Sequence, residues 1–355
     1  DPSSPLTPPS PSLRELAVLS PTLSRYTLDG SAVIINVCRL SVMIEVADLH
    51  KHFGTKEAVD GISFTVGKGE VLGFLGPNGA GKSTTMRVIT GFLPPTSGAV
   101  AIGGISITER PVEARSLLGY LPENAPSYAD MDVGQFLRFV AGVRGLRGVE
   151  RDKAVARAIK ACFLEPVQFQ SIDTLSKGYR HRVGLAQAIV HDPAVLILDE
   201  PTDGLDPNQK HEVRSLIRRM GTSKTIIFST HILEEVEAVC SRAIIIDRGK
   251  IVASGTPGEL KAMSKNAGRI LVRLAGGDPA AFAALCAHAS GCASAGPVEG
   301  ERVVAVVPAP KTPPAHLFGE VAALACKHKY EVEEIRIDEG RLDEVFREIT
   351  TGDAA

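Results

Sequence analysis

One glycine-rich loop determines the expected architecture: Gly76-Pro77-Asn78-Gly79-Ala80-Gly81-Lys82-Ser83-Thr84. It fits the phosphate-binding pattern G-x-x-x-x-G-K-[ST], between an apolar run at residues 71–75 and a helical pattern at about 82–91. Glycines let the backbone wrap closely around an anion, and the start of the helix directs free N–H groups toward it. The loop therefore predicts binding of a nucleoside triphosphate, with Lys82 at the phosphates and Ser83 on Mg²⁺.

Two adjacent carboxylates end a second apolar run. Asp199 and Glu200 follow residues 195–198, which have the character of a buried strand. Ligands of open α/β sheets bind beyond the carboxyl ends of the strands, so both side chains are expected beside the phosphates. We expect Asp199 to hold Mg²⁺ and Glu200 to accept a proton from, or polarise, the attacking water. Alone, the pattern is also a common strand-to-loop transition; the phosphate loop upstream favours the functional interpretation.

A third motif, Leu175-Ser176-Lys177-Gly178-Tyr179, directly precedes a helix with an apolar face. Together with the two other motifs, it resembles the Leu-Ser-Gly-Gly-Gln signature of the ABC ATPases, in a variant similar to one of exporter-type members. The resemblance implies that Ser176 and the backbone of Gly178 contact the γ-phosphate of an ATP held by an opposing subunit. A helix N-terminus suits that role. In isolation, Leu-Ser-x-Gly would be no more than a helix cap.

Three single residues match the family by position. Phe53, in His52-Phe53-Gly54, resembles the aromatic residue that stacks on adenine; a core phenylalanine is the alternative. Asp206, in Gly204-Leu205-Asp206, matches the loop through which the two subunits communicate. His231 follows a strand pattern at residues 225–228 and resembles the switch histidine at the γ-phosphate, although a lone histidine is more often structural.

One position departs from the family pattern. The family usually has Gln in the loop that touches both the metal site and the membrane partner, whereas this chain reads Leu121-Pro122-Glu123-Asn124. Ionised Glu only accepts hydrogen bonds, whereas Gln also donates them. Glu123 is expected to bind Mg²⁺ or its water and to leave hydrolysis intact, because members resembling gliding-motility and copper-site-assembly exporters also carry Glu here.

The chain is expected to have an α/β fold with two further parts. Short apolar runs alternate with amphipathic stretches, and the resemblance implies the P-loop ABC ATPase fold for residues 43–264, with a helical subdomain at about 123–178. A helical region at 133–162 is interrupted at residues 144–148.

The two ends of the chain differ in character from this central region. Residues 1–42, rich in Pro and Ser at their start, are expected to be disordered or a non-native extension upstream of Met43; a native arm is the alternative. Residues 265–355 are expected to form a small α+β domain. Strand patterns lie at 270–274, 303–307 and 331–337, and helical patterns at 279–288, 314–327 and 341–349.

Composition excludes several classes of function. A formal net charge of -2 provides no large basic field, so nucleic acid is not an expected partner. No apolar run has the length of a spanning helix, so the chain is expected to have no transmembrane segment of its own. The six cysteines show no C-x-x-C and no zinc-binding spacing, which is typical of thiols in a reducing compartment. They are Cys38, Cys162, Cys240, Cys286, Cys292 and Cys326.

The resemblance implies an ATPase subunit of an ABC transporter that binds ATP and Mg²⁺. It would form a homodimer through the ATP sites and bind integral-membrane permease subunits at the cytoplasmic face of the membrane, and the signature variant favours export. A non-transport ABC ATPase of translation or DNA repair would show tandem nucleotide domains, a coiled coil or zinc-binding cysteines. A P-loop kinase or GTPase would lack the motif at residues 175–179.

Overall fold

The computed structural model of the chain describes residues 26–28, 31–33, 42–125 and 127–351. The chain divides into two units, Asp1–Ser41 and Val42–Ala355. In the first unit, β1 (Tyr26–Leu28) and β2 (Ser31–Val33) pair in antiparallel orientation. Most of the upstream segment expected at residues 1–42, including Cys38, lies outside the described residues.

A six-stranded sheet forms the centre of the second unit and carries the motif residues at its strand ends. Five neighbouring strands are parallel, and β12 pairs antiparallel with β11 at one edge. Every residue of β5 and β9 is buried, as for strands covered on both faces. The α/β fold class expected from the sequence is confirmed. In spatial order, the strands are β12 (Lys250–Gly255), β11 (Arg242–Asp247), β5 (Val71–Leu75), β10 (Thr225–Thr230), β9 (Val195–Asp199) and β8 (Leu118–Leu121).

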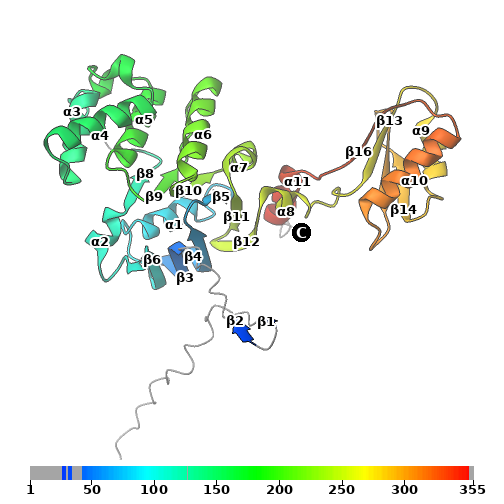
Figure 1. The fold of residues 1–355 in the computed structure, drawn as a ribbon, viewed down its shortest axis with the longest axis horizontal. Coiled ribbons are helices and arrows are strands. Elements are labelled where there is room, and N and C mark those ends of the chain that lie inside the picture. The colour runs from blue at the N-terminus through cyan, green and yellow to red at the C-terminus, as the bar shows by residue number, and fades with distance from the viewer. Residues whose placement is uncertain (1–25, 29–30, 34–41, 126, 352–355) are drawn as a thin grey trace, which may run out of the picture. The chain divides into compact units, whose positions relative to one another are not determined.

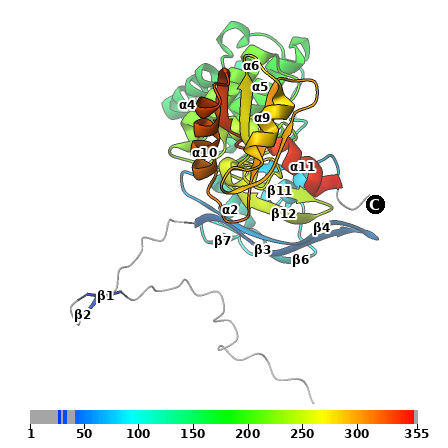
Figure 2. The ribbon, with the colours of Figure 1, turned by 90° about the vertical axis from the view of Figure 1, so that its right-hand side faces the viewer.

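An antiparallel sheet covers helix α1 (Lys82–Ile89) from the other side. Met86, Val88 and Ile89 of this helix share one buried cluster with residues of both sheets, so α1 is packed between them. Figure 2 shows the strands of the antiparallel sheet side by side, beneath β11 and β12. Their order is β4 (Lys56–Gly67), β3 (Val42–Phe53), β6 (Ser97–Ile102) and β7 (Ile105–Ser106).

Helices cover the opposite face of the six-stranded sheet. The helical region expected at 133–162 is present and is interrupted where the sequence indicated, because α3 ends at Val143 and α4 begins at Gly148. Asp132 starts α3 by accepting a hydrogen bond from the Gln135 amide at 2.7 Å. Figure 1 shows α3, α4 and α5 grouped together. The helices of this region are α3 (Val133–Val143), α4 (Gly148–Ala161), α5 (Lys177–Ile189), α6 (Pro207–Gly221) and α7 (Leu233–Val239), with short turns η2 (Glu165–Val167) and η3 (Ile172–Thr174). Helix α2 (Pro111–Ser116) lies on the side of α1 instead, since its buried residue Ala114 belongs to the same cluster as Met86.

A four-stranded antiparallel sheet with two helices follows α8 (Pro257–Lys261). Phe282, Leu317 and Val272 belong to a buried cluster of its own. The strand patterns expected in this region are present, and β14 is an additional strand. The elements are β13 (Ile270–Leu274), α9 (Pro279–Cys286), β14 (Cys292–Pro297), β15 (Val303–Pro308), α10 (Pro314–Lys327) and β16 (Val332–Ile337), with sheet order β14-β15-β13-β16.

The last described helix, α11 (Leu342–Thr351), packs away from that cluster. Leu342 is 1% exposed and shares a buried cluster with Leu260 of α8 and Ile245 of β11. Ser264 Oγ also donates to Glu344 at 2.6 Å. The helix was expected within the terminal α+β domain at 265–355. Its apolar side instead joins the central sheet, because Leu342 is buried in one cluster with residues of β5, β11 and α8.

Within the part of the chain that the structure describes, no helix combines the length and the apolar character needed to cross a membrane. The described cysteines are free thiols: Cys162, Cys240, Cys286, Cys292 and Cys326.

Candidate functional site

The glycine-rich loop joins the end of β5 to the start of α1, as the sequence predicted. Glycine is required at two positions of the loop, because a backbone carbonyl oxygen of another segment lies where a Cβ would be. A Cβ on Gly76 would lie 2.4 Å from the Ile246 carbonyl oxygen, and one on Gly81 would lie 2.5 Å from that of Ala58. Gly81 also has φ 108°, which L side chains rarely adopt. The loop is therefore held as a tight turn in front of the free N–H groups of α1.

Lys82 begins α1 and is only 6% exposed. Its Nζ donates to the carbonyl oxygens of Gly76 at 2.7 Å and Pro77 at 3.2 Å. Burial lowers the pKa of this ammonium group, and the nearby carboxylates of Glu200, Asp199 and Glu123 act in the opposite direction. The lysine is thus a buried cation at the base of the loop, with three carboxylates close enough to affect its charge.

Asp199, at the end of β9, is fully buried. Its Oδ1 accepts hydrogen bonds from Ser83 Oγ at 3.1 Å and from Ser229 Oγ at 2.5 Å. Among the described residues, its Oδ2 has no hydrogen-bond partner, although it is buried. A buried carboxylate oxygen without a partner is costly unless a cation or water satisfies it. Together with the Ser83 hydroxyl, it forms a set of oxygen donors of the kind that Mg²⁺ prefers.

Glu200 follows Asp199 in an unusual backbone conformation, with φ 51°. His231 Nδ1 lies 3.0 Å from Glu200 Oε2, and the backbone N–H of Glu200 donates to Ser229 Oγ at 3.0 Å. Burial raises the pKa of the Glu200 carboxyl, and this effect exceeds the lowering by His231 and Lys82. Strain and a raised pKa in one carboxylate are features of functional sites.

A cavity of about 450 Å³ brings most of the expected residues together. Of the three carboxylates expected at the phosphate and metal site, Glu123 and Glu200 face it together with His231, whereas Asp199 is not among its lining residues. Three lining residues were not expected from the sequence, namely Lys56, Ala58 and Asp203. The other lining residues are Asn78, Gly79, Gly81, Lys82, Ser83 and Thr84.

Phe53 is not among the residues that line this cavity. It ends β3 beside the turn to β4, is 47% exposed, and its ring centroid lies 5.1 Å from Lys51 Nζ. Lys56, its register partner on β4, does line the cavity. The hairpin end is therefore next to the site, and the aromatic ring is available on the surface.

Ser176, Gly178 and Asp206 also lie outside the cavity of their own chain. Ser176 Oγ accepts a hydrogen bond from the Tyr179 amide at 3.3 Å and caps α5. Asp206 Oδ1 accepts one from the Gln209 amide at 2.8 Å and caps α6. Within one chain, these three residues are therefore not part of the cavity that Lys82 and Glu200 line.

Sequence reasoning missed a buried network centred on Glu235 of α7. Glu235 is 1% exposed, and its carboxylate accepts hydrogen bonds from the Thr202 hydroxyl, from Thr230 Oγ1 at 2.8 Å and from Arg214 Nη2 at 3.2 Å. Thr230 precedes His231, and Thr202 lies in the segment after Glu200. No local spacing reveals the network, because its members come from four separate segments.

Comparisons with known proteins agree with this geometry. The family model described as ABC transporter matches residues 59–203. The Nod factor export ATP-binding protein I of Rhizobium meliloti is 36% identical over 249 residues, covering 69% of this chain and 73% of the relative. The linearmycin resistance ATP-binding protein LnrL of Bacillus subtilis is 36% identical over 219 residues, covering 61% of this chain and 70% of the relative.

A longer relative and a solved structure match the same region. The probable multidrug ABC transporter ATP-binding protein YbhF of Escherichia coli is 40% identical over 228 residues; these cover 63% of this chain but only 39% of YbhF. The structure of cbiO1 from Clostridium perfringens, part of the ABC transporter complex cbiONQ, matches with a TM-score of 0.57 and 31% identity, covering 63% of this chain and 92% of that protein. The chain belongs to the family of ABC transporter ATP-binding proteins.

Proposed function

We propose that this chain binds and hydrolyses ATP as the energising subunit of an exporter whose membrane-spanning subunits are separate chains. The observation that carries the proposal is the cavity that Lys82, Ser83 and Glu200 line. Asp199 contacts Ser83, and its second carboxylate oxygen is buried without a partner among the described residues. The names of the relatives, which include export and resistance proteins, support the direction of transport. A non-transport ABC ATPase is not favoured by these relatives.

The glycine-rich loop and Lys82 would hold the triphosphate. The N-terminus of α1 presents backbone N–H groups, and Lys82 Nζ exchanges its two loop carbonyl partners for phosphate oxygens. Ser83, Asp199 and Glu123 would hold Mg²⁺, directly or through water. When bound, Mg²⁺ neutralises phosphate charge in the transition state. Phe53 would stack on the adenine from the hairpin end.

Glu200 is the proposed general base. His231 Nδ1–H donates to one of its carboxylate oxygens and fixes the side chain, so that the other oxygen can accept a proton from the attacking water. A raised pKa makes the carboxylate a stronger base at neutral pH. His231 is half exposed and would contact the γ-phosphate through its other ring nitrogen.

The complete site is proposed to need two copies of the chain. Ser176 and Gly178 lie at the start of α5, where backbone N–H groups and the helix dipole favour an anion, yet they are outside the cavity of their own chain. In a homodimer, they would close over the ATP held by the opposite subunit, with Asp206 and its loop at the subunit contact. ATP would then join the two subunits, and hydrolysis would release them.

A surface groove is the proposed contact for the permease. It has a volume of about 860 Å³ and lies between the end of α1, α2 and the end of α3. Three large apolar residues on its lining are mostly exposed: Phe92, Val112 and Val143. Such a patch marks an interaction surface. Binding there would place the chain at the cytoplasmic face of the membrane.

The central experiment uses Glu200→Gln with Glu237→Gln on α7 as the matched control. Glu200→Gln should bind ATP, form a stable dimer in size-exclusion chromatography with Mg-ATP, and hydrolyse ATP very slowly. Glu237→Gln should behave like the wild type, because that carboxylate forms a surface ion pair with Lys261. A Glu200→Gln chain that stays monomeric and hydrolyses ATP normally would remove Glu200 from catalysis.

Glu123 is proposed to serve hydrolysis in place of the usual Gln. It lines the cavity and affects the charge of Lys82. Glu123→Gln should therefore change ATP turnover or its coupling to the permease, as measured in reconstituted vesicles. Wild-type turnover with unchanged coupling would show that the acid is incidental.

A further inference from the structure

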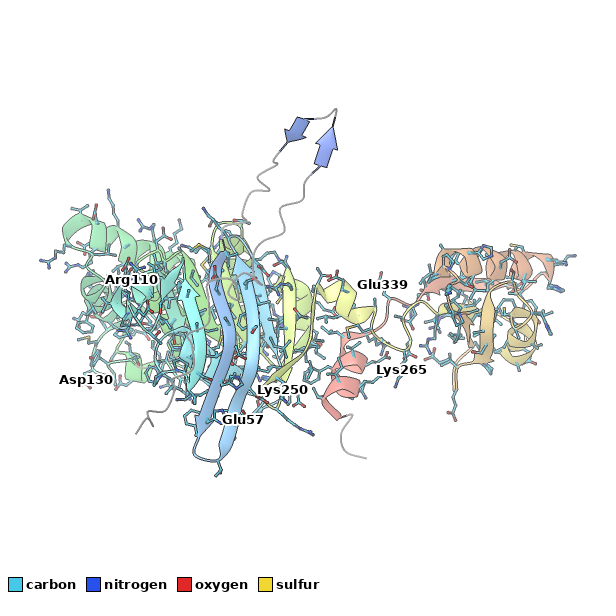
Figure 3. The ribbon with its side chains drawn as sticks, turned by 90° about the horizontal axis from the view of Figure 1, so that it is seen from below. Glu57, Arg110, Asp130, Lys250, Lys265 and Glu339 are labelled. Atoms are coloured by element: carbon cyan, nitrogen blue, oxygen red, sulfur yellow. The ribbon has the colours of Figure 1, made fainter. Side chains whose placement is uncertain are left out.

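A second cluster of potential metal ligands lies on the β3–β4 hairpin, apart from Ser83 and Asp199. His50 and His52 belong to β3, and Glu57 is the register partner of His52 on β4. His52 Nε2 is 3.3 Å and His50 Nδ1 is 3.9 Å from Glu57 Oε1. One donor atom from each of the three residues lies within 4.8 Å of the others. Figure 3 shows Glu57 toward the turn of this hairpin, with Lys250 beside it.

A second carboxylate contacts the other ring nitrogen of His50. His50 Nε2 lies 3.2 Å from Asp48 Oδ1. Because a carboxylate only accepts hydrogen bonds, Nε2 is the donor in this contact. The other ring nitrogen, Nδ1, lies 3.9 Å from Glu57 Oε1 and 3.5 Å from Asp60 Oδ1. Metal-binding histidines almost always donate their second N–H to such a carboxylate or carbonyl.

The backbone is shaped to bring these side chains to one place. The pairing of β3 with β4 shifts register between Leu49 and Lys51 and again between Lys51 and His52. Register shifts of this kind redirect side chains. Gly61 on β4, with φ 65°, leaves room for the His50 ring, because a Cβ there would lie 3.3 Å from His50 Cε1.

The local charge also favours a cation. Asp48, Glu57 and Asp60 surround His50, whereas Lys250 Nζ neutralises one of them through its 3.0 Å contact with Asp60 Oδ2. Two imidazole nitrogens therefore face one carboxylate oxygen in an acidic setting.

We propose that His50, His52 and Glu57 bind a divalent transition metal ion of the zinc type, with Asp48 positioning His50. Imidazole and carboxylate ligands suit zinc, whereas Mg²⁺ prefers oxygen ligands alone. Bonds of about 2.0–2.1 Å in tetrahedral geometry place neighbouring donors roughly 3.3 Å apart, so the side chains need only small movements to close around the ion. The metal ion would link β3 to β4 through His52, one residue before Phe53, and Glu57, one residue after Lys56. Lys56 lines the nucleotide cavity.

The test is isothermal titration of the untagged, chelator-treated full chain with Zn²⁺ alone and with Mg²⁺ alone, without nucleotide. The wild type should bind one more Zn²⁺ than His50→Ala/His52→Ala, and Mg²⁺ should not occupy this site. Asp48→Asn should weaken binding by about tenfold, because it removes only the group that orients His50. His316→Ala/His328→Ala, a double substitution of exposed histidines on and after α10, should leave Zn²⁺ binding unchanged.

Two results would overturn the proposal. One is equal Zn²⁺ stoichiometry and affinity in the wild type and in His50→Ala/His52→Ala, which would show that the pair are ordinary surface histidines. The other concerns the wild type alone and does not depend on any variant folding. X-ray absorption of the protein with one equivalent of Zn²⁺ should show nitrogen ligands at about 2.0–2.1 Å, and a shell of oxygen atoms only would contradict the site.

Discussion

Replacing Glu235 by Ala should destabilise the protein and slow hydrolysis together. The substitution removes three hydrogen bonds to a carboxylate that is 1% exposed and leaves Thr202, Thr230 and Arg214 without that acceptor. Removing one partner of a buried ion pair costs about 3–5 kcal/mol. Arg214 keeps some contact with water, since a quarter of its side chain is exposed, which favours the lower end of that range.

The assay compares urea denaturation and steady-state ATP turnover for three chains. Glu237→Ala, on the same helix, breaks a partly exposed ion pair with Lys261 and should lower the free energy of unfolding by only about 0–1 kcal/mol. Glu235→Gln keeps the shape but not the charge, so its loss should be intermediate. In Glu235→Ala, kcat should fall more than the affinity for ATP, because the network supports the segments of His231 and Thr202 and not the glycine-rich loop. Equal stability of Glu235→Ala and Glu237→Ala would refute the reasoning.

Three further predictions concern single sites. Gly81→Ala should lose nucleotide binding in a fluorescent-ATP titration, because a Cβ there lies 2.5 Å from the Ala58 carbonyl oxygen; wild-type affinity would contradict the strain argument. Leu342→Ala should lower the free energy of unfolding, measured in urea, by about 2–5 kcal/mol, because Leu342 of α11 is buried against α8. A negligible change in that free energy would show that α11 does not pack there. Burial raises the pKa of Glu200 in the folded chain. The ionised carboxylate therefore destabilises the fold at a pH above that pKa. The effect disappears at low pH, where Glu200 is protonated in both the folded and the unfolded state. The Tm of Glu200→Gln should therefore exceed that of the wild type at pH 7, and the gain should shrink as the pH falls through the folded pKa; a gain that grows with acidity would contradict it.

Local patterns were sufficient to predict the strands and turns that carry the phosphate site. The run before Gly76 and the run before Asp199 are entirely apolar, and both are buried parallel strands. The antiparallel sheet was largely missed, although Ile62, Phe64 and Val66 alternate with exposed residues in β4 and carry a strand signal. β14 was missed for a different reason, since its alanine, serine and glycine residues have little strand propensity and only its pairing with β15 defines it.

Features that depend on distant segments could not be predicted. Leu342 and Phe346 have the spacing of an amphipathic helix, but spacing does not specify which cluster the helix covers. Glu235 resembles any acidic residue of a helix until the fold brings Thr202 and Arg214 to it. Ser176 was correctly placed at a helix start, yet its position relative to a second chain depends on an assembly that one sequence does not describe.

Mixing two inactive variants tests the two-sided site most directly. One chain carries Lys82→Ala and the other carries Ser176→Arg, and each should be nearly inactive in an ATPase assay by itself. In a mixed dimer, one of the two sites pairs an unaltered glycine-rich loop with an unaltered Ser176, so the mixture should hydrolyse ATP faster than the sum of the separate chains. Wild-type hydrolysis by the Ser176→Arg chain alone, or a mixture no more active than its parts, would contradict the account.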